Sequence, residues 1–408
     1  YTAGLQKGKI VLSARDMEKT IAPGTVFHPD DNVGGTFTLH NVRIGIDFHW
    51  EKKEDQVFRG RLQLLAKNDI LTAVNILPVE DYLKSVISSE MSATSSAEML
   101  KAHAVMSRSW LLAQIDKNKN LYKGSLGYKT LFQTQDEIIR WYDREDHAYF
   151  DVCADDHCQR YQGITRATTT LVDQVVNQTN GEILAYKGAI CDARFSKCCG
   201  GVTELFENTW EPVSQPYLQK VIDNAEDPPD YALRLTDEEN ARAWISGRPA
   251  AFCNTEDRNV LAQVLNDYDQ STHDFFRWKV TYAAGELGDL IKSRTGIDFG
   301  IIMDLIPVQR GVSGRIIKLK IIGSKNTMTI GKELEIRKTL SKTHLYSSAF
   351  FVEKTGEGAD GLFILHGAGW GHGVGLCQIG AAVMGVKGYS YKEILAHYFR
   401  GSTLEKRY

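Results

Sequence analysis

Long hydrophobic runs are missing from this sequence of 408 residues. No apolar stretch approaches the roughly 18–20 residues that a membrane-spanning helix requires, so we expect no transmembrane segment in this chain. The opening residues, YTAGLQKGKI, also lack the charged start and apolar centre of a signal peptide. We therefore expect any export signal to lie outside this chain, and composition alone leaves the compartment open.

An excess of charge of one sign is absent as well. The chain has 48 basic and 51 acidic residues, which give a net charge of −3, and they are not gathered into long runs. Nothing in this pattern marks a nucleic-acid or membrane surface, so neither kind of partner is expected. Internal repeats and low-complexity linkers are also missing, which favours one mixed body over separable modules.

Cysteine is too unevenly placed for a disulfide scaffold. The chain has seven cysteines, an odd number, and they cluster at 153/158 and 191/198/199. The stretch DHAYFDVCADDHC holds four potential metal donors, His147, Cys153, His157 and Cys158. Zinc prefers nitrogen and sulfur donors of this kind. A Cys153–Cys158 disulfide in an exported protein is the competing hypothesis, and the spacing leaves both open.

The pattern of the chain predicts the α+β class. Short strands are expected at the start, a helical stretch from 77 to about 114, strands again after it, and a closing helix in SYKEILAHYF. We expect four regions: a β-rich N-terminal region at 1–70, the first part of a catalytic core at 71–224, a helical insertion of unknown role at 225–290, and the second part of the core at 291–408.

Glycine is concentrated in one stretch. HGAGWGHGVGLCQIGA runs from 366 to 381 and places glycine at every second position from 367 to 375. In an extended strand this spacing leaves one face bare, which indicates close approach by a ligand or another backbone. Close packing against a neighbouring helix is the alternative. Neither G-x-G-x-x-G nor G-x-x-x-x-G-K-[ST] occurs in the run, which argues against a nucleotide-phosphate loop.

The stretch LPVEDYLKSVISSEM predicts a helix that starts near Pro78. Leu83, Val86 and Ile87 form one apolar stripe, and Glu90 is the next position on it. Burial there raises a carboxyl pKa, as a general acid working near neutral pH requires. A glutamate at a frayed helix end, paired with an arginine, is the alternative.

A second helix, in MLKAHAVMSRSWLLAQ, follows at once and forms a hairpin with the first. Met99, His103, Met106 and Trp110 fall on one face, which is typical of a core, so we interpret His103 as a packing histidine. Arg108 lies on a different face and is expected to reach a polar partner.

Three blocks of the sequence closely resemble the SpoIID/LytB family of bacterial cell-wall proteins. They are LPVEDYLKSVISSEM…LKAHAVMSRSWLL, FSKCCGGVTELFENTW…PYL and GAGWGHGVGLCQIGA…GYSYKEILAHYFRGSTL, and the resemblance is absent between about 225 and 290. It implies an extracytoplasmic lytic transglycosylase that cuts peptidoglycan glycan strands stripped of stem peptides, with the catalytic glutamate on Glu90. Other members are described as enhancers of amidases, so a non-catalytic enhancer that binds peptidoglycan and assists a cell-wall amidase is the alternative.

The implied chemistry needs one carboxyl group. Glu90 protonates the glycosidic oxygen and then, as a carboxylate, takes the proton from the muramyl 6-hydroxyl as that oxygen closes on C1. Ordinary glycosidases use two carboxylates and a water. The expected product therefore has a 1,6-anhydro end.

The resemblance also implies substrate contacts and a metal set. The residues expected to contact glycan are Arg108, Ser196, Gly200, Gly201, Trp370, His372 and Gln378. Some members bind zinc through one histidine and two cysteines, which points to His147, Cys153 and Cys158, with His157 as a substitute.

The chain departs from the family at three positions. Cys198 and Cys199 stand where relatives commonly have small hydroxyl residues, and His103 stands where glutamine is expected. A cysteine hydrolase is a rival hypothesis, with Cys199 or Cys198 beside His372 or His147. A metal-dependent hydrolase is another.

Overall fold

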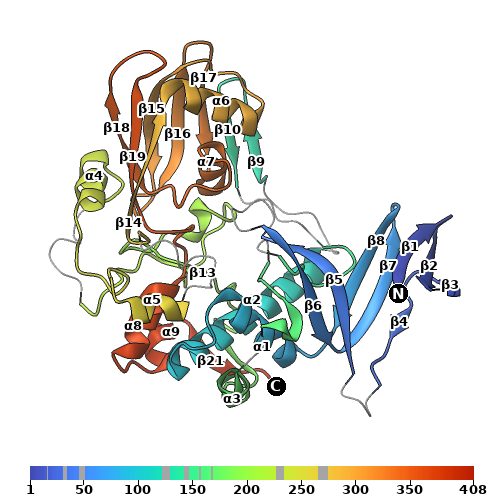
Figure 1. Ribbon diagram of the computed structural model, residues 1–408. Coiled ribbons are helices and arrows are strands. Elements are labelled where there is room, and N and C mark those ends of the chain that lie inside the picture. Colours follow the sequence, from blue (N-terminus) through green and yellow to red (C-terminus); the bar gives the residue numbers. More distant parts are fainter. Residues whose placement is uncertain are drawn as a thin grey trace.

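The computed structural model describes residues 1–15, 17–30, 35–45, 51–121, 129–141, 147–155, 158–166, 169–226, 234–264 and 274–408. Figure 1 shows three parts: N-terminal strands to one side, a helical part where early and late segments of the chain meet, and a sheet-rich part above it. The described residues contain both helices and strands, with strands gathered at the N-terminus and in one further part, so the predicted α+β class is confirmed.

In the described residues of the N-terminal part, every regular element is a strand. They are β1 (Thr2–Gln6), β2 (Lys9–Ala14), β3 (Met17–Ile21), β4 (Val26–Phe27), β5 (Thr36–Ile44), β6 (Lys52–Arg59), β7 (Arg61–Lys67) and β8 (Ile70–Ile76). Strands β1, β2 and β3 form one sheet, β4, β7 and β8 a second, and β5 pairs with β6. The last of these strands, β8, leads directly into the first helix.

The helical part contains the largest apolar core. Its helices are α1 (Val79–Glu90), α2 (Ala97–Leu121), α3 (Thr170–Gln178), α8 (Gln378–Val386) and α9 (Tyr391–Tyr398), and 3₁₀ turns lie at Gly163–Thr165 and Phe206–Asn208. Helix α2 contacts each of the other four helices. It begins with the strong helix formers of AEMLKA, and its buried side chains pack with those of α8 and α9 from the far end of the chain.

Short strands connect this helical part. Strands β11 (Glu182–Tyr186), β12 (Ala189–Ile190) and β21 (Thr403–Lys406) form one antiparallel sheet. Strand β13 (Phe195–Ser196) pairs in parallel with β20 (Leu376–Cys377), which brings the second and third motif blocks together.

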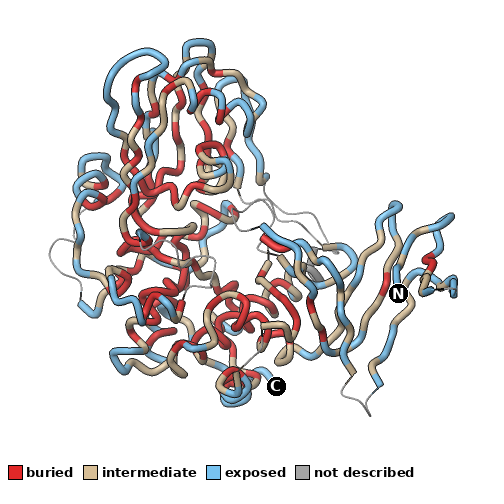
Figure 2. The backbone as a smooth tube through the Cα atoms, viewed as in Figure 1, coloured by how far each residue is buried: buried red, intermediate tan, exposed pale blue. Residues whose placement is uncertain are grey.

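The sheet-rich part has its own core. Strands β15 (Ile302–Arg310), β16 (Ile316–Gly323), β17 (Thr327–Gly331), β10 (Glu137–Arg140) and β9 (Leu131–Gln133) form one sheet in that order. A second sheet has the order β14 (Arg277–Ala283), β19 (Leu362–Ala368), β18 (Phe350–Thr355), and helices α6 (Ala284–Thr295) and α7 (Glu333–Thr339) pack with these sheets. Figure 2 shows that buried residues run through both this part and the helical part, whereas few occur among the N-terminal strands.

The segment 225–290 is only partly helical. It contains α4 (Glu238–Ser246) and α5 (Arg258–Val264), as expected, but residues 277–283 form β14. This strand pairs with β19 from Arg277 opposite Ala368 to Ala283 opposite Leu362. The helical prediction is wrong here because the aromatic residues of RWKVTYA suit a pleated sheet, where the Trp278 side chain is buried.

The glycine-rich segment is not the extended strand that its spacing predicted. Strand β19 ends at Ala368, and the glycines at 369, 371, 373 and 375 all have positive φ, between 74° and 92°. A Cβ atom on Gly373 would lie 2.3 Å from the guanidinium carbon of Arg315, and one on Gly375 would lie 2.1 Å from the carbonyl oxygen of Arg194. The absence of side chains at these glycines therefore makes room for Arg315 and Arg194. The alternative, close packing against a neighbouring helix, is not what these two positions show.

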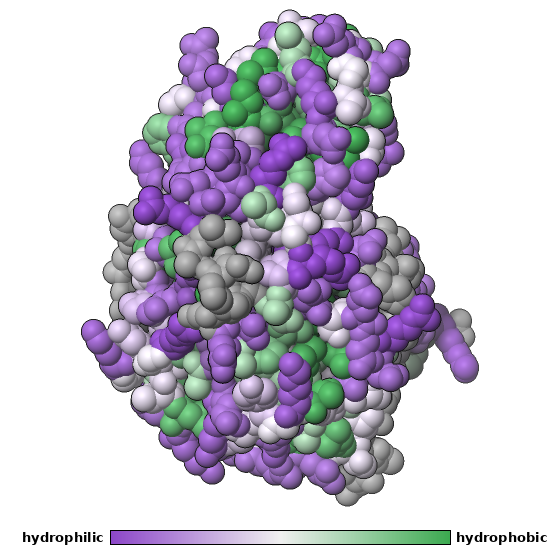
Figure 3. Space-filling model, turned by 90° about the vertical axis from the view of Figure 1, so that its left-hand side faces the viewer, coloured by the Kyte–Doolittle hydropathy of each residue, from purple (hydrophilic) through white to green (hydrophobic). Residues whose placement is uncertain are grey.

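No helix in the described part of the chain combines the length and apolarity needed to cross a bilayer. Figure 3 shows one face of the molecule, on which hydrophilic residues predominate and hydrophobic residues lie in separate areas of its upper and lower parts.

Candidate functional site

Glu90 lies at the C-terminal end of α1. The helix begins at Val79, directly after Pro78, and acidic residues occupy its first turn, where they suit the positive end of the helix dipole. Met91 is already extended, with φ −150° and ψ 171°. The helix therefore stops at Glu90 and presents its carboxyl group at the end of the hairpin's first arm.

The predicted apolar stripe of α1 is confirmed. Leu83, Val86 and Ile87 are each 0% exposed. Glu90 continues the stripe but is half-buried rather than sealed, and its Oε1 atom accepts a hydrogen bond of 2.7 Å from the backbone N–H of Arg160. The carboxyl group is thus oriented at the boundary between core and solvent.

The three predicted zinc donors lie together. The Nε2 atom of His147 is 3.4 Å from the Sγ atom of Cys158, and the donor atoms of His147, Cys153 and Cys158 all lie within 4.8 Å of one another. Zn–N and Zn–S bonds of about 2.0 and 2.3 Å at tetrahedral angles separate such donors by about 3.5 Å. This set could hold a zinc ion. His157, the expected substitute, lies outside the described residues.

The loop that carries Cys158 also contacts Glu90. Cys158 precedes Arg160 by two residues, so the loop that carries this sulfur also holds the carboxylate of Glu90. His147 and Cys153 also line a pocket of about 650 Å³, whose wall includes the rings of Tyr82 and Tyr161. This volume lies within the range of small-molecule sites.

Arg194 connects the loop that carries Cys158 to the glycine-rich segment. The sequence alone did not identify Arg194 as a residue of this site. Its side chain lies near Cys158 and near His372. The guanidinium group forms an ion pair of 2.7 Å with Asp192 and lies over the ring of Trp210 at 4.1 Å. Trp210 stands in the quoted motif ENTW, but no local spacing signals that it meets Arg194.

His372 faces this arginine cluster as a neutral imidazole. Burial, together with the positive charges of Arg194 and Arg315, lowers the pKa of His372 well below its ordinary value. Its Nδ1 atom accepts a hydrogen bond of 3.0 Å from the backbone N–H of Val374, which places the ring proton on Nε2. The ring also packs edge-on against Trp210 at 4.9 Å. The Nε2–H is directed to the backbone carbonyl of Phe195, so both ring nitrogens of His372 are hydrogen-bonded within the protein.

Trp370 is held by other aromatic rings. It is half-buried, with ring centroids 4.4 Å from Tyr346 and 4.7 Å from Phe275. Its backbone exchanges hydrogen bonds of 2.8 and 3.0 Å with Cys198, which fixes the glycine-rich segment against the FSKCCGG block. Sugar stacking by Trp370 stays a prediction.

Ser196 and the two glycines of FSKCCGG lie beneath that segment. Ser196 is 6% exposed, and its hydroxyl has no hydrogen-bond partner among the described residues. Gly200 and Gly201 are buried, and a Cβ atom on Gly201 would lie 2.8 Å from the ring of Trp244. The glycines pack against protein, so the expected contacts of Gly200 and Gly201 with sugar are not supported.

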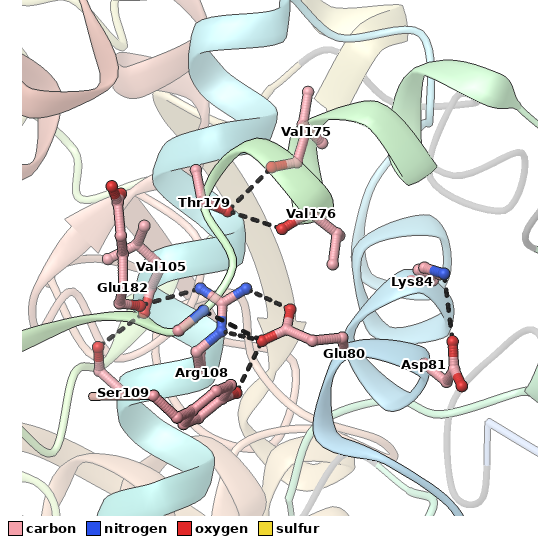
Figure 4. A network of polar contacts seen from close by, with 12 residues as sticks. Glu80, Asp81, Lys84, Val105, Arg108, Ser109, Val175, Val176, Thr179 and Glu182 are labelled. Atoms are coloured by element: carbon pink, nitrogen blue, oxygen red, sulfur yellow. Dashed lines mark hydrogen bonds and ion pairs between the residues drawn. The ribbon is translucent and has the colours of Figure 1, made fainter. Parts of the chain in front are cut away.

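Arg108 is not a substrate-binding residue. It reaches a polar partner, as expected, but it is 0% exposed and donates to both carboxylate oxygens of Glu80, at 2.9 and 2.6 Å (Figure 4). It also donates to the carbonyl oxygen of Glu182 at 2.9 Å. Burial raises the pKa of Glu80, but the hydrogen bonds from Arg108 outweigh this effect and bring the pKa below its ordinary value. Arg108 therefore joins α1, α2 and β11 inside the core.

Gln378 is also sealed from substrate. It is 2% exposed, and its Nε2 atom lies 3.4 Å from Nε2 of His103. The ring of His103 is 0% exposed, and its Nδ1 atom lies 3.2 Å from the hydroxyl of Ser107. Burial, and then the charge of Lys197, lowers the pKa of His103 to about 3. His103 is thus the packing histidine that the sequence predicted, and Gln378 is its partner.

A cysteine hydrolase is contradicted by burial. Cys198 and Cys199 are 0% and 2% exposed, in the middle of the largest apolar core. A nucleophilic thiolate must be reachable by its substrate.

Residues 67–186 match the model of a family described as Stage II sporulation protein. This range contains Glu90, His147, Cys153 and Cys158. Residues 204–375 match a second family, described as a domain of unknown function (DUF8618).

Three relatives are similar to this chain over most of its length. The chain is 28% identical over 381 residues to an uncharacterized protein of Brachyspira hyodysenteriae, which covers 93% of this chain and 75% of the relative. It is 25% identical over 325 residues to the Amidase enhancer of Bacillus subtilis, covering 79% of this chain and 40% of the relative. It is 24% identical over 336 residues to Stage II sporulation protein D of Bacillus amyloliquefaciens, covering 81% and 74%.

Proposed function

The chain belongs to the SpoIID/LytB family, and from this membership we propose that it is a peptidoglycan lytic transglycosylase that cleaves glycan strands stripped of stem peptides. One observation carries the proposal: Glu90 stands partly exposed at the end of α1, with its carboxyl group oriented by the N–H of Arg160. A general acid must be both held in place and open to substrate. Glu90 meets both conditions.

The reaction uses Glu90 twice. Its carboxyl group first gives a proton to the glycosidic oxygen as the bond to C1 breaks. The resulting carboxylate then takes the proton of the muramyl 6-hydroxyl, whose oxygen closes on C1. No water is consumed, and the carboxyl group is restored.

We propose that His147, Cys153 and Cys158 hold a zinc ion beside this carboxyl group. The three donor types are those that zinc prefers, and their spacing suits a tetrahedral ion. When bound, such an ion supplies positive charge that can attract a sugar oxygen. Trp370 is the protein's own group that binds and orients glycan beside it, through the exposed part of its ring, whereas both ring nitrogens of His372 are hydrogen-bonded within the protein.

Peptidoglycan as substrate implies an extracytoplasmic location for the working protein. Glycan strands stripped of stem peptides are the product of a cell-wall amidase. An amidase that acts before this protein is therefore the partner in the reaction sequence.

The test is mass spectrometry of the products formed from purified, denuded glycan strands. The proposal requires fragments with 1,6-anhydromuramyl ends, released by the wild-type chain and not by a Glu90→Gln variant. Products with reducing ends would show that water attacks instead, and would reject the transglycosylase reaction.

A non-catalytic enhancer of a cell-wall amidase is the second candidate function. The observation that favours it is the 25% identity to a relative named Amidase enhancer. An enhancer binds glycan and releases no product from intact or denuded strands, yet raises product release by an added amidase. An amidase assay with and without the wild-type chain therefore separates the two functions.

A further inference from the structure

A second group of sulfur side chains is buried where distant segments of the chain meet. Cys199 lies just after β13, Cys253 lies between α4 and α5, and Cys377 ends β20. Together with Asp223 they place four donor atoms within 4.8 Å of one another. The exposed fractions of these four residues are 2% or less, so the group is closed to solvent.

The spacing of the sulfur atoms suits a metal ion. The Sγ atoms of Cys199 and Cys253 are 3.7 Å apart. Zn–S bonds of about 2.3 Å at tetrahedral angles separate two sulfur ligands by about 3.8 Å. The S–S bond of a disulfide is much shorter, about 2.05 Å. The thiol of Cys198 also contacts those of Cys253 and Cys377, so four sulfur atoms meet at this point.

Hydrogen bonds already orient two of the four donors. The backbone N–H of Cys199 donates to Sγ of Cys377 at 3.2 Å, as expected for a sulfur that carries negative charge. Asp223 accepts the N–H of Cys253 at 2.9 Å on Oδ2 and the hydroxyl of Tyr398 at 2.5 Å on Oδ1. These contacts fix the carboxylate in the position of a ligand.

The residues around the four donors suit a cation that is bound by negatively charged ligands. An ionised carboxylate inside an apolar core costs free energy unless it is paired or bound to a metal. Arg315 and Arg277 approach the group from its rim, donating at 3.2 Å to the carbonyl oxygens of Cys199 and Gly200. Their positive charges offset the surplus negative charge of three thiolates and one carboxylate around a divalent ion.

We propose that Cys199, Asp223, Cys253 and Cys377 bind a structural zinc ion, distinct from any ion held by His147, Cys153 and Cys158. Four protein ligands complete the tetrahedron, so this ion has no open position and takes no part in chemistry on substrate. It cross-links the α4–α5 segment to β13 and β20. The inference does not depend on the proposed function, because its donors are separate from Glu90 and its ligand set.

The first measurement is the metal and thiol content of the whole chain, purified without chelator. The informative protein is the triple variant His147→Ala/Cys153→Ser/Cys158→Ser, which lacks the other donor set. The proposal requires that this variant retain about one zinc per chain, with tetrahedral thiolate-to-metal absorption after exchange for cobalt. A triple variant that neither retains nor takes up zinc overturns it.

Thiol titration separates the metal site from disulfides. Wild-type protein, denatured with a chelator and without reductant, should show all seven cysteines as thiols. A deficit of two or four thiols that maps to Cys199, Cys253 or Cys377 overturns the proposal.

The matched pair of variants is Cys253→Ser and Cys191→Ser, made in the triple-variant background. Both cysteines are buried, but Cys191 is not among the four donors. Cys253→Ser should lose the remaining zinc, and Cys191→Ser should keep it. If Cys253→Ser does not fold, the cobalt spectrum of the triple variant still decides. No activity is measured, so failure here would leave the transglycosylase proposal intact.

Discussion

The carboxyl group of Glu90 and the backbone N–H of Arg160 are joined by a hydrogen bond of 2.7 Å. Seventy residues separate the two in sequence, and the bond ties the end of α1 to the loop that carries Cys158. It holds the carboxyl group in one orientation without covering it. This geometry defines what a substitution at Glu90 should and should not change.

Glu90→Gln should give a folded, glycan-binding protein without turnover. The amide can still accept the N–H of Arg160, but it cannot give or take the proton, and a positioned acid–base group contributes about 10²–10⁴-fold in rate. Product release from denuded strands measures turnover, and pelleting with insoluble glycan measures binding. Near-normal product release by the variant would exclude Glu90 as the acid.

Cys158→Ser should lower the zinc content relative to wild type, because it removes one of three ligands of the proposed site. Cys191→Ser is the control, since Cys191 is buried elsewhere and is not one of these donors. Elemental analysis of both variants gives the answer. If the metal acts in substrate binding, product release by Cys158→Ser should recover at high glycan concentration. Equal zinc in wild type and Cys158→Ser would contradict the site.

Trp370→Ala should weaken glycan binding by about 1–3 kcal/mol if the ring stacks on a sugar. Because the ring also packs on Tyr346 and Phe275, some loss of stability is expected as well. Binding is therefore compared at equal concentrations of folded protein, measured by circular dichroism. An unchanged glycan affinity in the folded variant would show that Trp370 serves packing alone.

Arg108→Ala should lower the free energy of unfolding by about 3–5 kcal/mol, because it leaves Glu80 partly buried without its ion-pair partner. The control is Arg248→Ala, which breaks an exposed pair with Glu256 and should cost less than about 1 kcal/mol. Urea denaturation measures both. A stable Arg108→Ala protein with lost glycan affinity would restore Arg108 as a binding residue.

Acid should destabilise the protein partly through His103. The unfolded chain binds a proton on this residue near pH 6.5, whereas the folded protein does so only near pH 3. Between these values the unfolded state holds more protons, so stability falls as the pH is lowered from 6.5 toward 3. His103→Gln, which keeps a polar group beside Gln378, should make this fall shallower, whereas His28→Gln at an exposed position should not. Parallel urea titrations at several pH values test this, and equal slopes for wild type and His103→Gln would refute it.

The sequence predicted what depends on neighbouring residues. The stripe of Leu83, Val86 and Ile87 follows from helical periodicity, and the donors His147, Cys153 and Cys158 lie within one short stretch. The stripe was identified from periodicity alone, whereas the choice of these three donors among four rested on the resemblance to the SpoIID/LytB family. The position of Glu90 followed from the same periodicity, but its partial exposure depends on how the following loop packs.

What the sequence could not predict depends on segments that meet only in the folded chain. Arg194 and His372 are far apart in sequence, and so are Cys199 and Cys377. No periodicity connects them. The helical periodicity of α2 also gave no information on whether Arg108 would meet a sugar or Glu80.

The pairing of β14 with β19 has a consequence for engineering this protein. Residues 225–290 have the sequence appearance of an added piece, but excising them would remove β14 and leave β19 with an unpaired edge along its entire length. It would also remove Trp278, whose ring occupies the space left by the absent side chain of Gly367. A shortened chain should therefore associate edge to edge and precipitate rather than fold as a smaller protein, so this region can be probed by substitution but not by deletion.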